Sequence, residues 1–222
     1  MFEAVIFDWD GTLADTKSVI VVSFQKVLKE IGCKVSDKFL EKQIGIGARK
    51  MFKNILKNSD MPFDHKIIDS LVEKKNAFQI NLTNRIRLFN GVKDLLDFLQ
   101  SKVKIALATM SNRKVINKLL KEKGIRKYFD VVISADEVKE PKPNPEIFLK
   151  CARILKCHSK KCVVVEDSIF GTIAAKKANM KCIAISSGAY SIEELKKGDP
   201  DLIVKSIREK DKILKYIFCL NN

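Results

Sequence analysis

Two carboxylates near the start of the chain are the residues best placed to do chemistry. Residues 4–7 are apolar and are followed by Asp8, Asp10 and Gly11. An apolar run rich in Val, Ile and Phe is typical of a buried parallel strand, and ligands bind at the carboxyl ends of such strands. Side chains two residues apart on an extended chain point to the same side. The sequence therefore predicts that Asp8 and Asp10 face one site, although an ordinary Asp-rich turn is the alternative.

Length and composition limit the class of protein. The chain has 222 residues, of which 46% are hydrophobic and 31% charged. It can therefore bury a sizeable core, either as one large domain or as a domain with an insert. No segment approaches the roughly 18 uninterrupted apolar residues of a membrane span. The first apolar run begins almost at Met1, which leaves no room for a signal peptide. We expect a cytoplasmic protein that does not enter a membrane.

The strong positive charge raises the question of nucleic-acid binding. Lysine and arginine total 42 against 27 acids, which gives a net charge of +15. A basic chain of this kind is a candidate nucleic-acid binder. The lysines are spread along the whole chain, however, and no aromatic residues interleave with them as a stacking platform requires. The pattern favours a solvated lysine-rich surface that attracts anionic substrates, so we expect no nucleic-acid partner.

The six cysteines show no metal or disulfide framework. They form no C-x-x-C pair, and most lie within apolar patterns. Cys157 and His158 with Cys162 are conceivable metal ligands, but their spacing matches no usual zinc motif. Reduced thiols in the interior of a cytosolic protein are the favoured interpretation.

A helical block follows the first strand. Residues 15–82 carry apolar side chains at helical spacing, beginning with the face formed by Ile20, Phe24, Val27, Leu28 and Ile31. Ser36 and Asp64 are suited to cap the second and fourth helices of the block. We interpret residues 15–83 as an inserted helical cap domain within a core formed by residues 1–14 and 84–222.

Strands and helices alternate in the remainder of the chain. Apolar runs predict strands at 103–108, 131–133, 162–165, 182–185 and 202–204. The intervening stretches have helical patterns, among them 91–100, the segment capped by Ser111 or Asn112, the segment opened by Pro145, and 171–179. This alternation predicts an α/β fold with a doubly wound parallel sheet.

Polar residues follow the later strands at equivalent places. Thr109 ends the second strand, Lys142 lies in the proline-rich loop after the third, and Glu166 and Asp167 end the fourth. Because the carboxyl ends of parallel strands share one edge of the sheet, these groups can converge on the two aspartates. Each has a purely structural reading on its own, such as a strand-end hydroxyl or a solvated lysine. Their joint occurrence in this order favours a common site.

Four motifs resemble those of the haloacid dehalogenase superfamily. They read Asp8-Trp9-Asp10-Gly11-Thr12-Leu13, Ala108-Thr109-Met110-Ser111-Asn112, Lys142-Pro143-Asn144-Pro145-Glu146 and Val165-Glu166-Asp167-Ser168. The likeness covers nearly the full length and is to the branch of phosphoglycolate phosphatase and β-phosphoglucomutase. It implies a Rossmann-like α/β core with an inserted all-helical cap. Asn90 replaces the family's usual proline, and Trp9 replaces Met, Leu or Phe, neither of which touches the chemistry.

The resemblance implies a role for each polar residue. Asp8 would be the nucleophile that attacks phosphorus and forms an aspartyl phosphate. Asp10 would be the general acid that protonates the leaving oxygen and later activates water. Thr109 would hold phosphate oxygens, and Lys142 would balance the charge on phosphate and Asp8. Positioning and charge neutralisation are most of what phosphoryl transfer needs.

The resemblance also implies a Mg²⁺ cofactor. Its ligands would be Asp8, the backbone carbonyl of Asp10 and Asp167, with Glu166 as an outer or variable ligand, since hard oxygen donors suit Mg²⁺. Substrate contacts are expected from Gly11, Arg49, Ser111 and Asn112. A guanidinium suits phosphate and carboxylate oxygens. The alternative for Arg49 is that it opens a cap helix in solvent.

Three functions are consistent with these residues. The first is a Mg²⁺-dependent phosphatase, monomeric or weakly dimeric, that hydrolyses a small phosphorylated metabolite such as a phosphoglycolate-like acid or a sugar phosphate. The second is a β-phosphoglucomutase-like mutase. The third is a non-catalytic nucleic-acid-binding protein on the same fold, which the intact set of polar residues disfavours. Ile44 stands where the mutase pattern has a lysine, which favours hydrolysis. The dehalogenases of the superfamily lack the second aspartate, so Asp10 disfavours that reaction.

Overall fold

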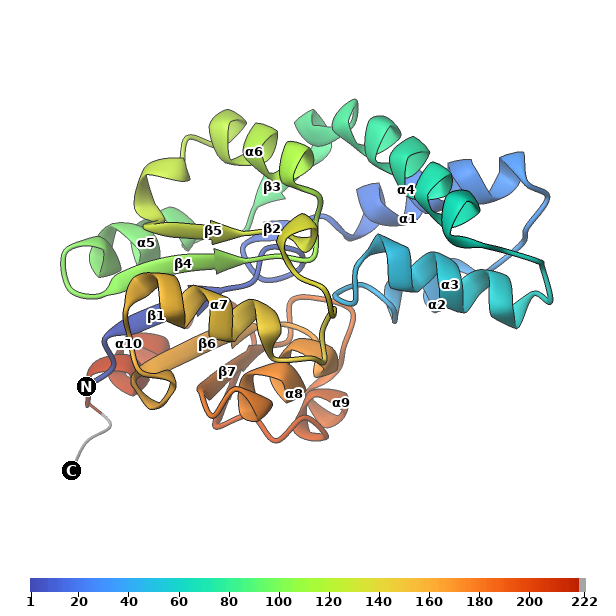
Figure 1. Cartoon of the computed structure of the whole chain (residues 1–222). Helices are drawn as coiled ribbons and strands as arrows, with labels where there is room; N and C mark the ends of the chain where they lie inside the picture. Colours follow the sequence, from blue (N-terminus) through green and yellow to red (C-terminus); the bar gives the residue numbers. More distant parts are fainter. Residues whose placement is uncertain (220–222) are drawn as a thin grey trace.

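A six-stranded parallel sheet forms the centre of the protein in the computed structural model, in which residues 1–219 are described (Figure 1). The strand order is β5-β4-β1-β6-β7-β8. Their bounds are β1 Ala4–Phe7, β4 Lys104–Ala108, β5 Val131–Ile133, β6 Cys162–Glu166, β7 Lys181–Ile185 and β8 Leu202–Val204. All five strand pairs are parallel. The predicted α/β fold is thus confirmed, with β1 at the point where the strand order changes direction.

Helices cover both faces of the sheet, because side chains on each strand alternate between two apolar layers. Val5 and Phe7 of β1 pack in one layer, and Ala4 and Ile6 pack in the other. The first layer is closed by α5 (Val92–Gln100), α6 (Arg113–Glu122) and α10 (Lys210–Cys219). The second is closed by α7 (Glu146–Leu155) and α8 (Ile169–Lys177). The short helix α9 (Ile192–Lys196), which sequence patterns did not predict, borders β7 and β8.

The predicted starts of α6 and α8 agree with the structure to within two residues. Asn112, and not Ser111, caps α6 by accepting a hydrogen bond from the Lys114 backbone N–H at 3.0 Å. Helix α8 begins at Ile169 and not at residue 171, because Ser168 accepts the Gly171 N–H at 3.0 Å. These caps fix where the polar loops leave the sheet edge.

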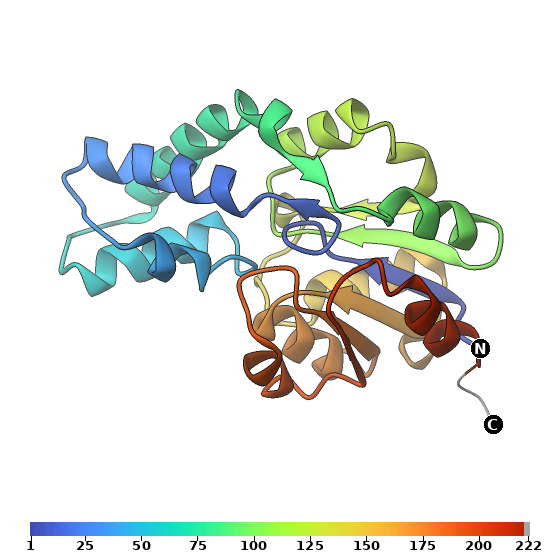
Figure 2. The ribbon, with the colours of Figure 1, turned by 180° about the vertical axis from the view of Figure 1, so that it is seen from behind.

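The inserted segment forms four helices that lie together beside the sheet edge (Figures 1 and 2). They are α1 (Lys17–Glu30), α2 (Asp37–Glu41), α3 (Ala48–Asn58) and α4 (His65–Ile80). Ser36 and Asp64 cap α2 and α4 as predicted. The apolar side chains form a separate cluster, in which the Phe24 and Phe52 rings lie 4.7 Å apart. The cap therefore has a hydrophobic core of its own.

The apolar residues of helix α4 at positions 67, 68, 71, 72 and 78 predict its buried face, and the structure confirms full burial at 68 and 71 only. Ile67 is exposed, and the buried stripe continues from Ile68 and Leu71 through Lys75 and Gln79. These positions follow the helical repeat, so one face of α4 is buried along its length. Its second half buries polar side chains where an apolar core was expected.

A two-stranded antiparallel sheet links the inserted helices to the core. It pairs β2 (Ala14–Asp15) with β3 (Arg87–Leu88) and was not predicted, because two-residue strands leave no periodic signal. The cap limits at residues 15 and 83 fall at or near these strands and remain a prediction. None of the helices in the described part of the chain has the length and apolar character that a bilayer crossing requires.

Separate hydrophobic cores predict that the cap can be destabilised on its own. Phe52→Ala removes a fully buried ring and should lower the free energy of unfolding of the cap by about 3–5 kcal/mol. In urea, the helical circular dichroism should then begin to fall before the fluorescence of Trp9, the single tryptophan, which is buried in the core. Phe148→Ala, a matched deletion beneath the sheet, should shift the Trp9 transition. Coincident transitions in Phe52→Ala would contradict the two-unit organisation.

Candidate active site

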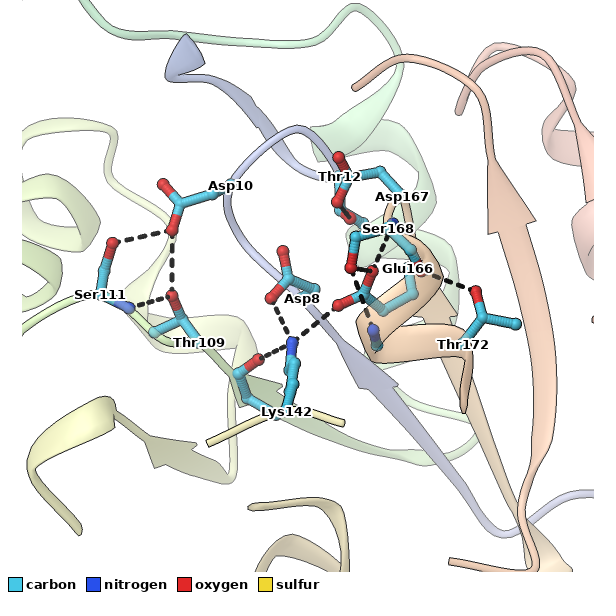
Figure 3. A network of polar contacts seen from close by, with 12 residues as sticks. Asp8, Asp10, Thr12, Thr109, Ser111, Lys142, Glu166, Asp167, Ser168 and Thr172 are labelled. Carbon is cyan, nitrogen blue, oxygen red and sulfur yellow. Dashed lines mark hydrogen bonds and ion pairs between the residues drawn. The ribbon is translucent and has the colours of Figure 1, made fainter. Parts of the chain in front are cut away.

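The predicted polar residues converge at the carboxyl edge of the sheet (Figure 3). Asp8 follows β1, and its backbone N–H donates to the Val165 carbonyl at 3.0 Å, which continues the strand ladder by one residue. Glu166 ends β6 and Asp167 follows it. The side chains gathered there are all buried, and they are Asp8, Asp10, Thr109, Ser111, Lys142, Glu166 and Asp167. Residues far apart in the sequence therefore form one site.

Lys142 is the cation at the centre of this group. Its Nζ donates to Asp8 Oδ1 at 2.6 Å, to Glu166 Oε1 at 2.7 Å and to the Ala108 carbonyl at 3.3 Å. Burial alone would lower the pKa of this lysine, but the two carboxylates outweigh burial and raise it. Lys142 therefore stays protonated and holds Asp8 in one orientation.

Asp10 is held on a different side of the site. Its Oδ2 accepts hydrogen bonds from Ser111 Oγ at 2.7 Å and from Thr109 Oγ1 at 3.4 Å. Its Oδ1 is buried and has no hydrogen-bond partner among the described residues. In Figure 3 the carboxyl group of Asp10 points towards Ser111 and away from Asp8. Thr109 and Ser111, predicted to contact phosphate and substrate, are thus engaged with Asp10.

Three carboxylates offer a cation site. One oxygen each of Asp8, Glu166 and Asp167 lies within 4.8 Å of the others, and within the described residues this is the single group of His, Cys, Asp and Glu side chains with such spacing. The sulfur-based alternative at Cys157, His158 and Cys162 is therefore not supported.

The charge of this group fits a divalent cation. Burial raises the pKa of Asp8 to about 8 in spite of Lys142, and burial together with Glu166 raises the pKa of Asp167. Buried acids with raised pKa values lack sufficient positive charge nearby. Both Glu166 oxygens are already occupied, by Lys142 and by the Ser168 N–H and hydroxyl. Asp8 and Asp167 are consequently the freer ligands, in keeping with Glu166 as an outer one.

Glycines make room for these carboxylates. Gly11 has φ of +83°, and a Cβ there would lie 2.2 Å from Asp167 Oδ2. The Cβ of any residue at 188 would lie 1.7 Å from the same oxygen. Glycine is therefore required at position 11 for steric reasons, because a larger residue would clash with Asp167. The contact of Gly11 with substrate remains a prediction. Thr12 completes the surround by donating from Oγ1 to Asp167 Oδ1 at 3.1 Å.

A cavity of about 710 Å³ lies between the cap helices α3 and α4 and the core loops. Two acidic residues, Asp136 and Glu140, line the cavity. The basic residues that line it are more numerous and are Arg49, Lys50, Lys53, Lys75, Lys139, Lys142 and Lys177. Lys142 lines this cavity and also bonds Asp8 and Glu166, so the cavity extends to the buried carboxylates. The cavity is therefore suited to an anionic molecule large enough to reach from the cap to Asp8.

Arg49 and Asn112 both line this cavity, but each already has a partner. The Arg49 guanidinium is half-exposed and pairs with Asp69 on α4. Asn112 caps α6 and donates from Nδ2 to Asp136 Oδ1 at 2.9 Å. Their contacts with substrate remain predictions. To bind substrate, Arg49 must share or give up its pairing with Asp69, and Asn112 must do the same with Asp136.

Lys75 is a residue of the site that no sequence motif indicates. This lysine of α4 is 4% exposed, donates to Gln79 Oε1 and lies 5.4 Å from the centre of the Phe24 ring. It borders a small pocket together with Asp10 and Ser111, as well as the large cavity. Burial lowers its pKa to about 8, with Asp10 acting in the opposite direction. The helical spacing of Lys75 from Ile68 and Leu71 is a sequence signal that this lysine lies on the buried face of α4. A search for apolar faces does not include a lysine.

The fold and site define a class of hydrolase with a helical insert after its first strand, and comparisons with known proteins identify the family. The sequence profile described as haloacid dehalogenase-like hydrolase matches residues 5–185. The phosphorylated carbohydrates phosphatase of Thermotoga maritima is 33% identical over 187 residues, which are 82% of this chain and 83% of that protein. The fructose-1-phosphate phosphatase of Escherichia coli is 28% identical over 185 residues, covering 83% and 96%.

A solved structure gives the same result. The crystal structure of β-phosphoglucomutase from Clostridium difficile matches with a TM-score of 0.86 and 30% identity, over 98% of this chain and 99% of that one. The chain belongs to the haloacid dehalogenase-like hydrolase family. It is an enzyme of the phosphoric monoester hydrolase class, which confirms the family resemblance and the reaction class predicted from the motifs.

The position of Lys75 predicts an alkaline limit on substrate affinity. An amine with a pKa of about 8 is charged below that pH and neutral above it, so kcat/KM for an anionic substrate should fall as pH rises through about 8. Lys75→Met should remove this fall and raise KM about tenfold or more, since a hydrogen bond to a charged group contributes roughly 1.5–3 kcal/mol. Steady-state kinetics from pH 6 to about 9.5 test this expectation.

Lys74→Met is the matched control, because Lys74 is exposed on the same helix and pairs with Glu30. It should leave the pH profile unchanged. An alkaline limb that persists in Lys75→Met would show that another group titrates.

Proposed function

We propose that this protein is a Mg²⁺-dependent phosphatase that hydrolyses a small phosphorylated metabolite through an aspartyl-phosphate intermediate. The observation that carries the proposal is the arrangement of the two aspartates. Asp8 is held by Lys142 at 2.6 Å, and Asp10 has a separate buried oxygen, Oδ1, that has no hydrogen-bond partner among the described residues. One carboxylate is thus fixed for attack, and the other is free to exchange a proton.

The first half-reaction uses both aspartates. A carboxylate oxygen of Asp8 forms a bond to phosphorus, and the bond from phosphorus to the substrate oxygen breaks. Asp10 gives its proton to that leaving oxygen, so the alcohol departs neutral. Ser111 and Thr109 orient Asp10 for this transfer through their contacts with Oδ2.

The second half-reaction reverses the role of Asp10. Water attacks the phosphorus of the aspartyl phosphate while Asp10 takes up its proton, and the bond from phosphorus to the Asp8 oxygen breaks. Inorganic phosphate and free Asp8 result. Lys142 stays within hydrogen-bond distance of Asp8 in the structure and offsets the negative charge that gathers on it.

Mg²⁺ would be held by Asp8, Asp167 and the backbone carbonyl of Asp10, with Glu166 behind them. When bound, the ion offsets the repulsion between the carboxylates and an incoming phosphate. The raised pKa values of Asp8 and Asp167 support this proposal, because they mark a site with too little positive charge of its own.

The substrate is proposed to be a phosphoglycolate-like acid or a sugar phosphate. The cationic lining of the cavity supports an anionic molecule, and two relatives are named for phosphorylated carbohydrates and for fructose 1-phosphate. The cytoplasmic location and the monomeric or weakly dimeric state remain predictions.

A sugar-phosphate mutase is the second candidate, because the similar Clostridium difficile structure is that of a β-phosphoglucomutase. In such an enzyme the phosphoryl group on Asp8 returns to a sugar phosphate and not to water. Ile44 stands where the mutase pattern has a lysine, and its side chain is buried within the cap cluster. A buried isoleucine offers no charge to hold a second phosphate, which favours hydrolysis.

Replacement of the nucleophile should abolish turnover without unfolding the protein. Asp8→Asn should lower kcat about 10³-fold or more, as expected when a covalent step loses its nucleophile. The readout is phosphate release across a panel of phosphorylated metabolites, with thermal unfolding as the control for structure. Turnover within about tenfold of the wild type would rule out the nucleophilic role.

The mutase alternative is tested by product analysis. Enzyme with Mg²⁺, β-glucose 1-phosphate and a catalytic amount of the bisphosphate should release inorganic phosphate and form negligible glucose 6-phosphate. Both products are measured over the same time course. Rapid formation of glucose 6-phosphate without matching phosphate release would favour the mutase.

A further inference from the structure

Lys42, the C-cap residue that follows α2, joins the cap to the core through several groups at once. Its Nζ donates to both oxygens of Glu194, at 2.6 and 2.7 Å, and to the Ala189 carbonyl at 2.7 Å. The same ammonium lies 4.7 Å from the centre of the Tyr190 ring, and the Tyr190 hydroxyl donates back to the Lys42 carbonyl. The ammonium of this single cap residue therefore contacts both a carboxylate and an aromatic ring of the core.

The core side of this contact is arranged in advance. Glu194 forms a capping box with Ser191, in which the Ser191 N–H donates to Glu194 Oε2 at 2.8 Å. Tyr190 is buried and meets Phe170 edge to face, with ring centres 6.3 Å apart. The hydrogen bond from Lys42 lowers the pKa of Glu194 to about 2, so the pair stays ionised at working pH. Glu194 and Tyr190 are therefore already held in place by the core and lose little conformational freedom when they bind Lys42.

The loop that follows Lys42 reaches the active site. A Cβ on Gly45 would lie 3.0 Å from Ser168 Oγ, and a Cβ on Gly47 would lie 3.0 Å from the Met110 side chain. Ser168 hydrogen-bonds Glu166, and Met110 stands between the two residues that hold Asp10. The glycines allow the loop to lie directly on both polar loops of the core, so a shift of Lys42 is passed to the residues around the reacting groups.

Within residues 1–219, the other hydrogen bonds from side chains that join cap and core lie close to the connecting strands. Lys118 donates to the Ile80 carbonyl at 3.0 Å, and Thr83 donates to Glu122 at 3.1 Å. Both Ile80 and Thr83 shortly precede β3. A rotation about the β2–β3 pair moves such groups little, whereas it carries Lys42, midway along the inserted segment, away from Glu194.

We propose that Lys42, Tyr190 and Glu194 form a clasp that holds the cap in its closed position over the active site. The three are positioning residues, because they act through the loop at 43–47 and touch no reacting atom. Closure excludes water from the buried carboxylates and from Lys75, and the clasp raises the fraction of molecules that are closed before substrate binds. Only the kinetic part of its test rests on the proposed phosphatase function.

The test without substrate follows the burial of Lys75, which lines the pockets between cap and core. Lys42→Met should raise the rate of acetylation of Lys75 by acetic anhydride, measured by peptide mass spectrometry, about fivefold or more, since opening exposes a side chain that is 4% exposed when closed. Glu194→Gln should have a similar effect while keeping the capping box. Lys17→Met, which removes an exposed lysine paired with Glu41 inside the cap, is the matched control and should leave the rate unchanged.

The kinetic test uses the same variants in the full-length enzyme. Lys42→Met and Glu194→Gln should each raise KM about three- to tenfold and change kcat by less than about threefold, because they lower the fraction of closed molecules and bound substrate restores the closed arrangement of the reacting groups. The double variant should resemble Lys42→Met, because residue 194 has no ammonium left to bind once Lys42 is replaced. Thermal unfolding checks that each variant is folded, and Tyr190→Phe provides a second variant that keeps the ring.

The results separate the clasp from the phosphatase proposal. Raised Lys75 labelling in both clasp variants supports the clasp even if no phosphate is released. Lys75 labelling equal to the wild type in folded Lys42→Met and Glu194→Gln would overturn it, as would strictly additive effects in the double variant.

Discussion

The buried contact of Lys142 with Asp8 and Glu166 is the interaction on which the rest of the site depends. Four buried carboxylates stand at the edge of the sheet, and this ammonium is the one cation bonded to them among the described residues. Taking charges out of water is costly unless they are paired, so the fold must supply both the lysine and hydrogen-bond donors such as Thr12 and Ser168. The remaining deficit of positive charge favours the binding of a cation beside these carboxylates.

Much of the core could be predicted because its signals are local. A parallel strand covered on both faces is mostly apolar, so the strands at 105–108 and 162–165 stand out as short apolar runs bounded by polar residues. The rule that ligands bind at the carboxyl ends of such strands then placed Asp8, Thr109 and Asp167 together, and the structure brings them to one edge. Cap chemistry located the ends of helices within two residues.

The parts that could not be predicted depend on contacts between distant segments. The stripe on α4 contains Lys75 and Gln79, which look like solvated residues in a sequence because nothing local shows that Asp10 lies opposite. Nothing in the local sequence distinguishes Lys42 from the other lysines, because its partners Glu194 and Tyr190 lie about 150 residues later in the chain. The strands β2 and β3 are two residues each and are defined only by one another. Such features follow from the fold and not from local patterns.

The central position of β1 has a consequence for how the chain is made. This strand leaves the ribosome before its neighbours β4 and β6, which begin only at residues 104 and 162. An apolar strand with two open edges is a template for wrong pairing until both partners arrive. The helices at 17–80 pack on one another around their own hydrophobic cluster and can fold in the meantime. We therefore expect the inserted segment to form early during synthesis, with the sheet, and with it the catalytic edge, completed late.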